Sequence, residues 1–249
     1  MRRKNVHFNV EPFGHKMKAI NHRYILLFSY SLFFLLLSCG NTESDEIEKA
    51  DKASSKDEKG NTNFLEDYEA IGANGTVNAI IEIPSGTVEK WELNKTNGQI
   101  EPEHVNNALR IINYLGYPGN YGMVPKTILS KELGGDGDPL DIIVLGPPVD
   151  RGGIIECKVI GILYLMDNQE QDDKLVAVSP NSMLYEVDDV SELEAKYNGI
   201  SEILEIWFTN YKGPGKITSN GFGNKISALE VLAAAIKQYE LSDAATIPK

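Results

Sequence analysis

The segment GGDGDPLDIIVL, residues 134–145, joins a carboxylate-rich turn to an apolar strand. Its three carboxylates, Asp136, Asp138 and Asp141, lie within six residues and repel one another unless a cation lies among them. The glycines and Pro139 bend the backbone, so the carboxylates can point toward one centre. Ligands that are all oxygen favour Mg2+, which keeps some of its waters and commonly bridges to substrate phosphates. The segment therefore indicates a Mg2+ site at the start of a strand.

Two other interpretations of this segment are an EF-hand-like calcium loop and an acidic surface turn. A calcium loop needs Gly at its sixth position and Glu at its twelfth, where this chain has Asp141 and Pro147. The segment alone leaves the surface turn open. A second acidic turn with Asp167, Asp172 and Asp173 follows the next long apolar run, however. Two carboxylate clusters can hold the paired metal ions that assist an in-line phosphoryl displacement.

The phosphates of such a substrate would need cationic and phenolic donors. Each candidate alone is weak evidence, because surface lysines and amphipathic tyrosines are common. The candidates are Lys90, Arg110, Tyr121, Lys174, Tyr211 and Lys212. Beyond residue 38 the only histidine is His104, which we expect in an exposed loop, so neither a histidine-based zinc site nor a Ser-His-Asp triad is expected. Cys157 lies in an apolar run and is expected to be a buried strand thiol.

Short β-rich runs separated by Gly, Pro and Asn favour a barrel or sandwich between residues 64 and 249. These runs are residues 77–83, 88–93, 142–145, 154–166 and 175–178. Ser191 and Glu194 form a capping-box pattern before apolar residues at helical spacing, and Asn198-Gly199 is expected to divide that helical region. A final helix is expected to bury the face formed by Ile226, Leu229, Leu232, Ala233, Ile236 and Tyr239.

Residues 1–38 have the pattern of an export signal. A basic region precedes an apolar run over residues 24–37, which is about the length of a signal-peptide core and short for a spanning helix. The run ends in Leu36-Leu37-Ser38-Cys39, which resembles the bacterial lipobox, in which the cysteine is lipidated. We therefore expect a lipoprotein signal peptide and a protein anchored by lipid at a bacterial membrane, outside the cytoplasm. The alternative is an uncleaved N-terminal anchor, and the chain starts at Met1 or Met17.

Residues 39–63 are polar and acidic, without aromatic residues or an apolar period, and predict a disordered tether. The whole chain has 24 basic and 36 acidic residues, a net charge of −12. Residues 1–38 hold six basic residues and one acidic residue, so the remaining chain has 18 against 35, a net charge of −17. A nucleic-acid partner is not expected for so acidic a protein. The sequence does not determine the oligomeric state, and a homo-oligomer is compatible with it.

The segment from Asp136 to Ile142 resembles the signature of the family I soluble inorganic pyrophosphatases. Together with the other motifs of that family it spans about residues 77 to 216. The other motifs follow in the family's order: Ile81-Glu82-Ile83-Pro84, Lys90-Trp91-Glu92, Tyr117-Pro118-x-Asn120-Tyr121-Gly122, Asp172-x-Lys174-Leu175-Val176-Ala177-Val178 and Tyr211-Lys212. The resemblance implies an α+β fold, a small five-stranded β-barrel of OB-like topology with flanking α-helices. It also implies hydrolysis of pyrophosphate to two phosphates with several Mg2+ ions.

The resemblance further implies a role for each site residue. Asp136, Asp141 and Asp172 resemble the ligands of the tightest metal ion, and Asp138 resembles the base that takes the proton of the attacking water. The further acidic positions around the metals are Glu82, Glu92 and Asp167. The groups that match those gripping the phosphates are Lys90, Arg110, Tyr121, Lys174, Tyr211 and Lys212.

The chain departs from the family pattern at two places. Asn168 follows Asp167 where the family often has an acidic residue, and the spacing between Arg110 and Tyr117 differs from the bacterial pattern. Two other functions remain as alternatives. One is a broader phosphoanhydride hydrolase that acts on polyphosphate or nucleotides. The other is a non-catalytic OB-type binding lipoprotein, since OB barrels also bind oligonucleotides and sugars.

Overall fold

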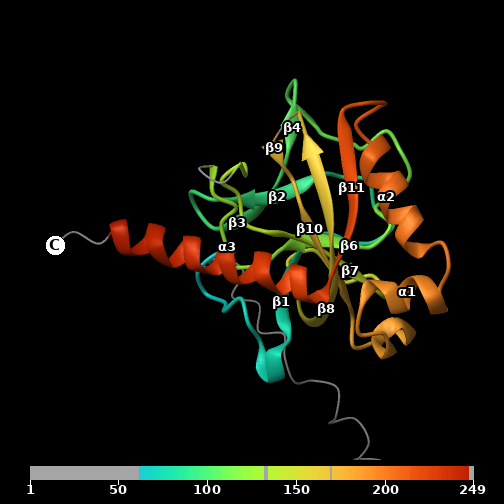
Figure 1. Ribbon diagram of the computed structural model, residues 1–249. Coiled ribbons are helices and arrows are strands. Elements are labelled where there is room, and N and C mark those ends of the chain that lie inside the picture. Colours follow the sequence, from blue (N-terminus) through green and yellow to red (C-terminus); the bar gives the residue numbers. More distant parts are fainter. Residues whose placement is uncertain (1–61, 132–133, 169, 247–249) are drawn as a thin grey trace, which may run out of the picture. The chain divides into compact units, whose positions relative to one another are not determined.

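The computed structural model describes residues 62–131, 134–168 and 170–246 (Figure 1). The predicted signal peptide (residues 1–38), the lipidation at Cys39 and nearly all of the tether (residues 39–63) lie outside the described residues. Among the described helices, none is both long enough and apolar enough to cross a membrane.

One sheet of seven strands forms the centre of the structure. Its hydrogen-bonded order is β1-β6-β7-β10-β8-β11, β9 pairs with β8, and a further pairing between β1 and β8 closes five of the strands into a ring. Only β7 and β10 run parallel. This ring confirms the predicted α+β fold with a five-stranded OB-like barrel. The strands are β1 (Val77–Ile83), β6 (Asn120–Met123), β7 (Asp141–Leu145), β8 (Ile154–Asp167), β9 (Glu170–Gln171), β10 (Lys174–Val178) and β11 (Ile217–Asn224).

Of the strands that were expected from apolar runs, β1, β7 and β10 are buried on both faces. On β7, Ile142 and Val144 belong to a core cluster that also contains Leu232 of the last helix. Ile143, between them, belongs to a second cluster with Trp207 of another helix. Since successive side chains of a strand point to opposite faces, a strand covered on both sides needs a continuous apolar run rather than an alternating one. Free Cys157 is buried in the first cluster, as predicted, and burial raises the pKa of its thiol to about 12.

Three α-helices flank the barrel: α1 (Val190–Lys196), α2 (Ile200–Asn210) and α3 (Lys225–Thr246). The division between α1 and α2 is confirmed, because Gly199 has a φ of 95°, which glycine adopts more readily than other residues. The predicted capping box is wrong. The N-cap of α1 is Asp189, whose carboxylate accepts a hydrogen bond from the Ser191 amide. The cap precedes the predicted Ser191 by two residues, because an aspartate caps a helix as well as a serine does.

The buried face of α3 also differs from the predicted one. Ile226 is 67% exposed and Leu229 is 39% exposed. Leu232 is buried as predicted and Ile236 packs against the core cluster, but Ala228 and Ala235, which were not predicted, are buried beside them. The small alanines allow a close approach to the core, so the helix is rotated away from Ile226 and Leu229.

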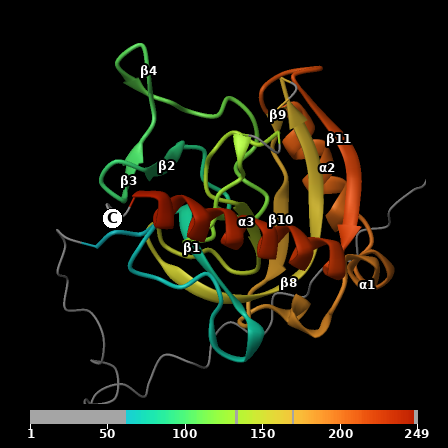
Figure 2. The ribbon, with the colours of Figure 1, turned by 60° about the vertical axis from the view of Figure 1, so that its left-hand side comes forward.

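Two hairpins extend beside the barrel (Figure 2). The first pairs β2 (Trp91–Asn94) with β3 (Gln99–Pro102), and the second pairs β4 (His104–Val105) with β5 (Ala108–Leu109). The strand expected at residues 88–93 thus begins only at Trp91. His104 is exposed as expected, although it lies in a short strand rather than a loop. The described residues also include the 3-10 helices η1 (Ala73–Gly75) and η3 (Met183–Glu186).

Candidate active site

A cavity of about 380 Å³ opens where β1, β6 and β7 meet the two hairpins. Twelve of the thirteen predicted catalytic and metal-binding residues line it. The exception is Lys174, which does not line the cavity but contacts two residues that do. The twelve are Glu82, Lys90, Glu92, Arg110, Tyr121, Asp136, Asp138, Asp141, Asp167, Asp172, Tyr211 and Lys212.

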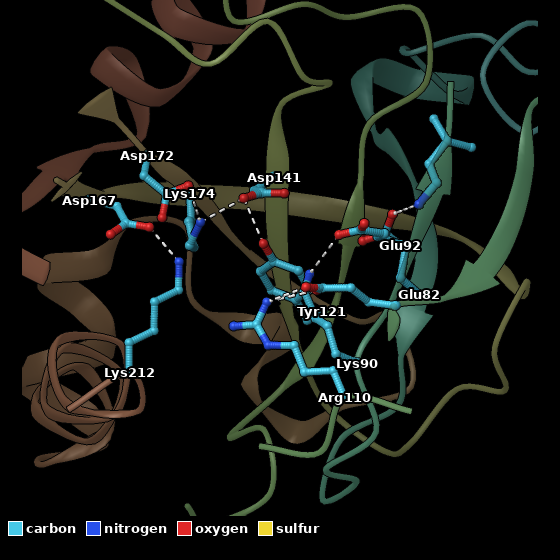
Figure 3. Close-up of polar contacts among 12 residues, drawn as sticks. Glu82, Lys90, Glu92, Arg110, Tyr121, Asp141, Asp167, Asp172, Lys174 and Lys212 are labelled. Carbon is cyan, nitrogen blue, oxygen red and sulfur yellow. Dashed lines mark hydrogen bonds and ion pairs between the residues drawn. The ribbon is translucent and has the colours of Figure 1, made fainter. Parts of the chain in front are cut away.

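We call Tyr121, Asp141, Asp172 and Lys174 the inner wall (Figure 3). Lys174 donates to Asp141 at 2.6 Å and to Asp172 at 2.9 Å, and its side chain is only 2% exposed. The Tyr121 hydroxyl donates to the same Asp141 oxygen at 2.6 Å. Parallel pairing aligns Lys174 of β10 with Asp141 of β7, so both lie at the same edge of the barrel. The strands themselves therefore fix the position of these charges.

Gly122 lets Tyr121 reach this position. A side chain at Gly122 would collide with the carbonyl oxygen of Ile80, so only glycine permits β6 to lie this close to β1. Because the two strands are in close contact, the ring of the neighbouring Tyr121 packs among the aromatic residues of the second core cluster, including Tyr117 and Phe208.

The electrostatics of the inner wall follow from burial and pairing. Burial by itself would lower the pKa of Lys174, but Asp141 and Asp172 raise it above its usual value, so the ammonium stays charged. Burial raises the pKa of Asp172, and Lys174 opposes that rise. Burial, followed by the charge of Asp141, raises the pKa of Tyr121 well above its usual value. Tyr121 is therefore a hydroxyl donor at any ordinary pH.

Glu82 is the most buried carboxylate that lines the cavity, with 5% exposure. It accepts a hydrogen bond of 2.7 Å from the amide of Leu93, which ties β1 to β2. Burial raises the pKa of Glu82 to about 7, against the opposing effect of Lys90. The ammonium of Lys90 lies 5.3 Å from the centre of the Tyr121 ring and 3.8 Å from a carboxylate oxygen of Glu92.

The acidic segment at residues 136–141 lies partly on the rim of the cavity. Gly137, with a φ of 84°, reverses the chain so that the Asp138 amide donates to the Asp136 carboxylate at 2.8 Å. Burial raises the pKa of Asp136. Asp138 forms an ion pair with Lys95, and the two side chains are 52% and 51% exposed. Lys95 lies in the turn between β2 and β3 and was not predicted.

The opposite side of the cavity is formed by the end of α2. Tyr211 stacks on Trp207 with ring centres 4.7 Å apart, and Lys212 forms an ion pair with Asp167. Burial alone would lower the pKa of Lys212, but Tyr211 and Asp167 raise it. Asn168, which stands where the family often has an acidic residue, donates its amide to Asp167 at 2.9 Å.

Asp173 and Arg110 differ in their position relative to the cavity. Asp173, which the sequence placed in the second acidic turn, does not line the cavity; its carboxylate accepts from the Leu165 amide and from Gln171. Arg110 lines the cavity, and its Nη1 donates to both carboxylate oxygens of Glu103, at 2.7 and 2.8 Å. No local pattern in the sequence pointed to Glu103.

The donor set fits Mg2+. The predicted metal ligands, all carboxylates, face one cavity, and hard cations such as Mg2+ prefer oxygen ligands. Within the described ranges, no three His, Cys, Asp or Glu side chains converge as a finished metal site. Several of the carboxylates are instead bonded to lysines, namely Lys90, Lys174 and Lys212.

Comparison with known proteins agrees with this geometry. Residues 79–240 match the sequence model of the inorganic pyrophosphatase family. The chain is 34% identical over 178 residues to an inorganic pyrophosphatase of Campylobacter jejuni, covering 66% of this chain and 92% of the relative. It is 31% identical over 183 residues to that of Rickettsia typhi, covering 71% and 97%.

Solved structures give the same result. The inorganic pyrophosphatase of Helicobacter pylori superimposes with a TM-score of 0.60 at 30% identity, covering 70% of this chain and 99% of that one. For the enzyme of Schistosoma japonicum the TM-score is 0.64 at 28% identity, with 70% of each chain covered. Since the family model matches residues 79–240 and relatives more than 30% identical cover about two thirds of the chain, the chain belongs to the inorganic pyrophosphatase family.

Proposed function

We propose that this inorganic pyrophosphatase depends on Mg2+, which the predicted acidic residues hold, and that it works outside the cytoplasm on a lipid anchor. The observation that supports the metal set is its convergence, because six carboxylates from distant parts of the sequence line one cavity. They are Glu82, Glu92, Asp136, Asp141, Asp167 and Asp172.

When bound, Mg2+ offsets phosphate charge and makes a coordinated water more acidic. The remaining work belongs to the side chains. Asp138, which is half exposed beside the cavity, takes the proton of the attacking water. Lys90, Arg110 and Lys212 bind phosphate oxygens through charge-assisted hydrogen bonds, and Tyr121 and Tyr211 add hydroxyl donors. Lys174, for which the resemblance implies a phosphate contact, is instead proposed to hold Asp141 and Asp172 in place from within the inner wall.

A phosphate-release assay tests this reaction against its alternatives. We expect rapid release from pyrophosphate with Mg2+, little from polyphosphate or ATP, and none after exhaustive chelation. Ca2+ should inhibit, because its larger and more flexible coordination sphere misplaces the attacking water. Comparable rates on all three substrates would favour the broader hydrolase. Binding without turnover would favour the non-catalytic module.

The location of the enzyme is a separate part of the proposal, and only the sequence supports it. The basic region, the apolar run and the lipobox-like end at Cys39 agree with one another, and the acidic segment that follows would serve as a tether to the domain at residues 64–249. Cys39→Ser should abolish labelling by a radioactive fatty acid and release or misprocess the protein on membrane fractionation. Unchanged lipid labelling of this variant would refute the anchor without affecting the proposed chemistry.

A further inference from the structure

Three chain segments meet beside the cavity in a closed set of backbone hydrogen bonds. The Lys90 amide donates to the Arg110 carbonyl at 2.9 Å, the Arg110 amide donates to the Glu103 carbonyl at 2.8 Å, and the Glu103 amide donates to the Lys90 carbonyl at 3.0 Å. All three side chains line the cavity. Two proposed phosphate-binding cations and one carboxylate therefore share a single backbone junction.

The β4–β5 hairpin sets which residues face each other at this junction. Its two turn residues, Asn106 and Asn107, have φ values of 53° and 61°, and a two-residue turn with both values positive matches the twist of an antiparallel pair. His104 then pairs with Leu109, and the next pair toward the barrel is Glu103 with Arg110. Side chains directly opposite each other in this way interact strongly.

The contact between Glu103 and Arg110 is specific. Both carboxylate oxygens accept from the single atom Nη1, and the two side chains are only 22% and 28% exposed. Nη2 and Nε of the guanidinium are not bonded to Glu103. A planar guanidinium held at one corner keeps its remaining N–H groups in a fixed direction, which is the arrangement that recognises phosphate oxygens well.

We propose that Glu103 is a positioning residue for pyrophosphate binding: it fixes the guanidinium of Arg110 so that Nη2 and Nε face the substrate. Without Glu103, Arg110 would be a long, flexible cation beside a cavity rich in carboxylates, and it could pair with one of them instead. The enzyme would then have to order this side chain each time substrate binds. This inference rests on the proposed role of Arg110 as a phosphate ligand.

From charge alone, removal of Glu103 would have the opposite effect on pyrophosphate binding. A measurement of binding can therefore distinguish the two effects. Glu103 is an anion beside a site for a polyanion, so its removal would strengthen pyrophosphate binding if repulsion were its main effect. The two effects move the KM for pyrophosphate in opposite directions. A positioning role predicts a higher KM with kcat little changed, because the carboxylate of Glu103 bonds to Arg110 and is not among the proposed metal ligands or the proposed base.

The experiment measures kcat and KM for pyrophosphate at saturating Mg2+ in the full chain. We expect Glu103→Gln to raise KM about three- to tenfold, the scale of ordering one flexible side chain on binding, and Glu103→Asp to recover part of the loss. Asp188→Asn serves as a matched control, because it also removes a carboxylate from an ion pair, with Lys158, but lies outside the cavity. Its KM should equal that of the parent protein.

Arg110→Gln tests the role of Arg110 in phosphate binding separately from the positioning role of Glu103. If it leaves KM unchanged, the proposed role of Arg110 fails. If it raises KM and Glu103→Gln has no additional effect in the double variant, the coupling supports the positioning role. A lower or unchanged KM in Glu103→Gln, or fully additive effects in the double variant, would overturn the inference while Arg110 keeps its role. Thermal unfolding of each variant checks that the fold is intact.

Discussion

The inner wall and the rim of the cavity carry similar residue types in opposite settings. On the inner wall, Lys174 is 2% exposed and its partner Asp141 is 21% exposed, and both lie in paired strands. On the rim, Lys95 and Asp138 are 51% and 52% exposed and lie in turns. Strands hold the buried lysine and its partner in fixed positions, and a turn holds the carboxylate for which we propose proton exchange with water. A Lys–Asp ion pair is therefore expected to contribute differently to stability on the inner wall and on the rim.

The largest effect, on the rate of hydrolysis, is expected at Asp138, the rim residue for which we propose a catalytic role. Asp138→Asn removes the proposed proton acceptor and should slow hydrolysis about 100- to 10,000-fold. Asp141→Asn instead takes a charge from the proposed tightest metal site, so its defect should shrink as Mg2+ is raised. Rates measured against Mg2+ concentration distinguish the two. Equal rescue of both variants by excess Mg2+ would show that the roles have been assigned wrongly.

The next effect concerns the stability of the inner wall. Lys174→Met leaves Asp141 and Asp172, which are 21% and 18% exposed, next to each other without their buried cation. Breaking a buried pair in this way costs about 3–5 kcal/mol of unfolding free energy. Urea denaturation in the presence of a chelator measures the loss, and added Mg2+ should restore part of it by taking the place of the ammonium. A loss below about 1 kcal/mol would mean that the wall behaves like an exposed pair.

A third effect tests Glu82, the most buried carboxylate that lines the cavity, through pH. Glu82 has its pKa raised from 4.5 to about 7, so the folded protein binds a proton there more tightly than the unfolded chain does. The resulting stabilisation is complete below pH 4.5 and is lost as the pH rises through about 7. Across that window the loss amounts to about 3 kcal/mol.

Glu82→Gln should remove this dependence. In metal-free protein we expect the variant to be more stable than the parent at pH 8 and equal to it near pH 4, because Gln can still accept the hydrogen bond from Leu93. Urea unfolding of both proteins across this range gives the difference directly. A stability difference that does not change with pH would contradict the burial-driven shift.

The comparison between wall and rim also explains what could be predicted from the sequence. The strands β1, β7, β8 and β10 were placed within about one residue, because a strand covered on both faces needs an apolar run and such runs are conspicuous. β11 was missed because its sequence, ITSNGFGN, is polar and glycine-rich. β11 forms a strand because it pairs with the edge of β8. Such a tertiary contact is not encoded in any local sequence pattern.

The residues of the site likewise include some that were predicted from the sequence and some that were missed. The wall residues were identified because they resemble the family motifs, and three of them, Tyr121, Asp141 and Lys174, lie on strands. Lys95 and Glu103 were missed because their partners, Asp138 and Arg110, depend on how the turns of two hairpins bring them to the cavity. Glu103 is seven residues from Arg110 in the sequence, and only the two-residue turn at Asn106 places them opposite each other.

The smallest effect belongs to the rim and completes the comparison with Lys174. Lys95→Gln removes the partner of Asp138, but both groups remain in contact with water, which replaces the lost interaction. Exposed pairs contribute about 0.2–1 kcal/mol, and salt screens them. We therefore expect urea unfolding in the presence of a chelator to show a loss below about 1 kcal/mol that disappears in high salt, whereas the loss in Lys174→Met should persist there. The loss of unfolding free energy in Lys95→Gln could instead match that in Lys174→Met, or persist in high salt. Either result would show that the rim ion pair stabilises the protein as much as the wall ion pair does. Solvent exposure would then not explain the difference between rim and wall.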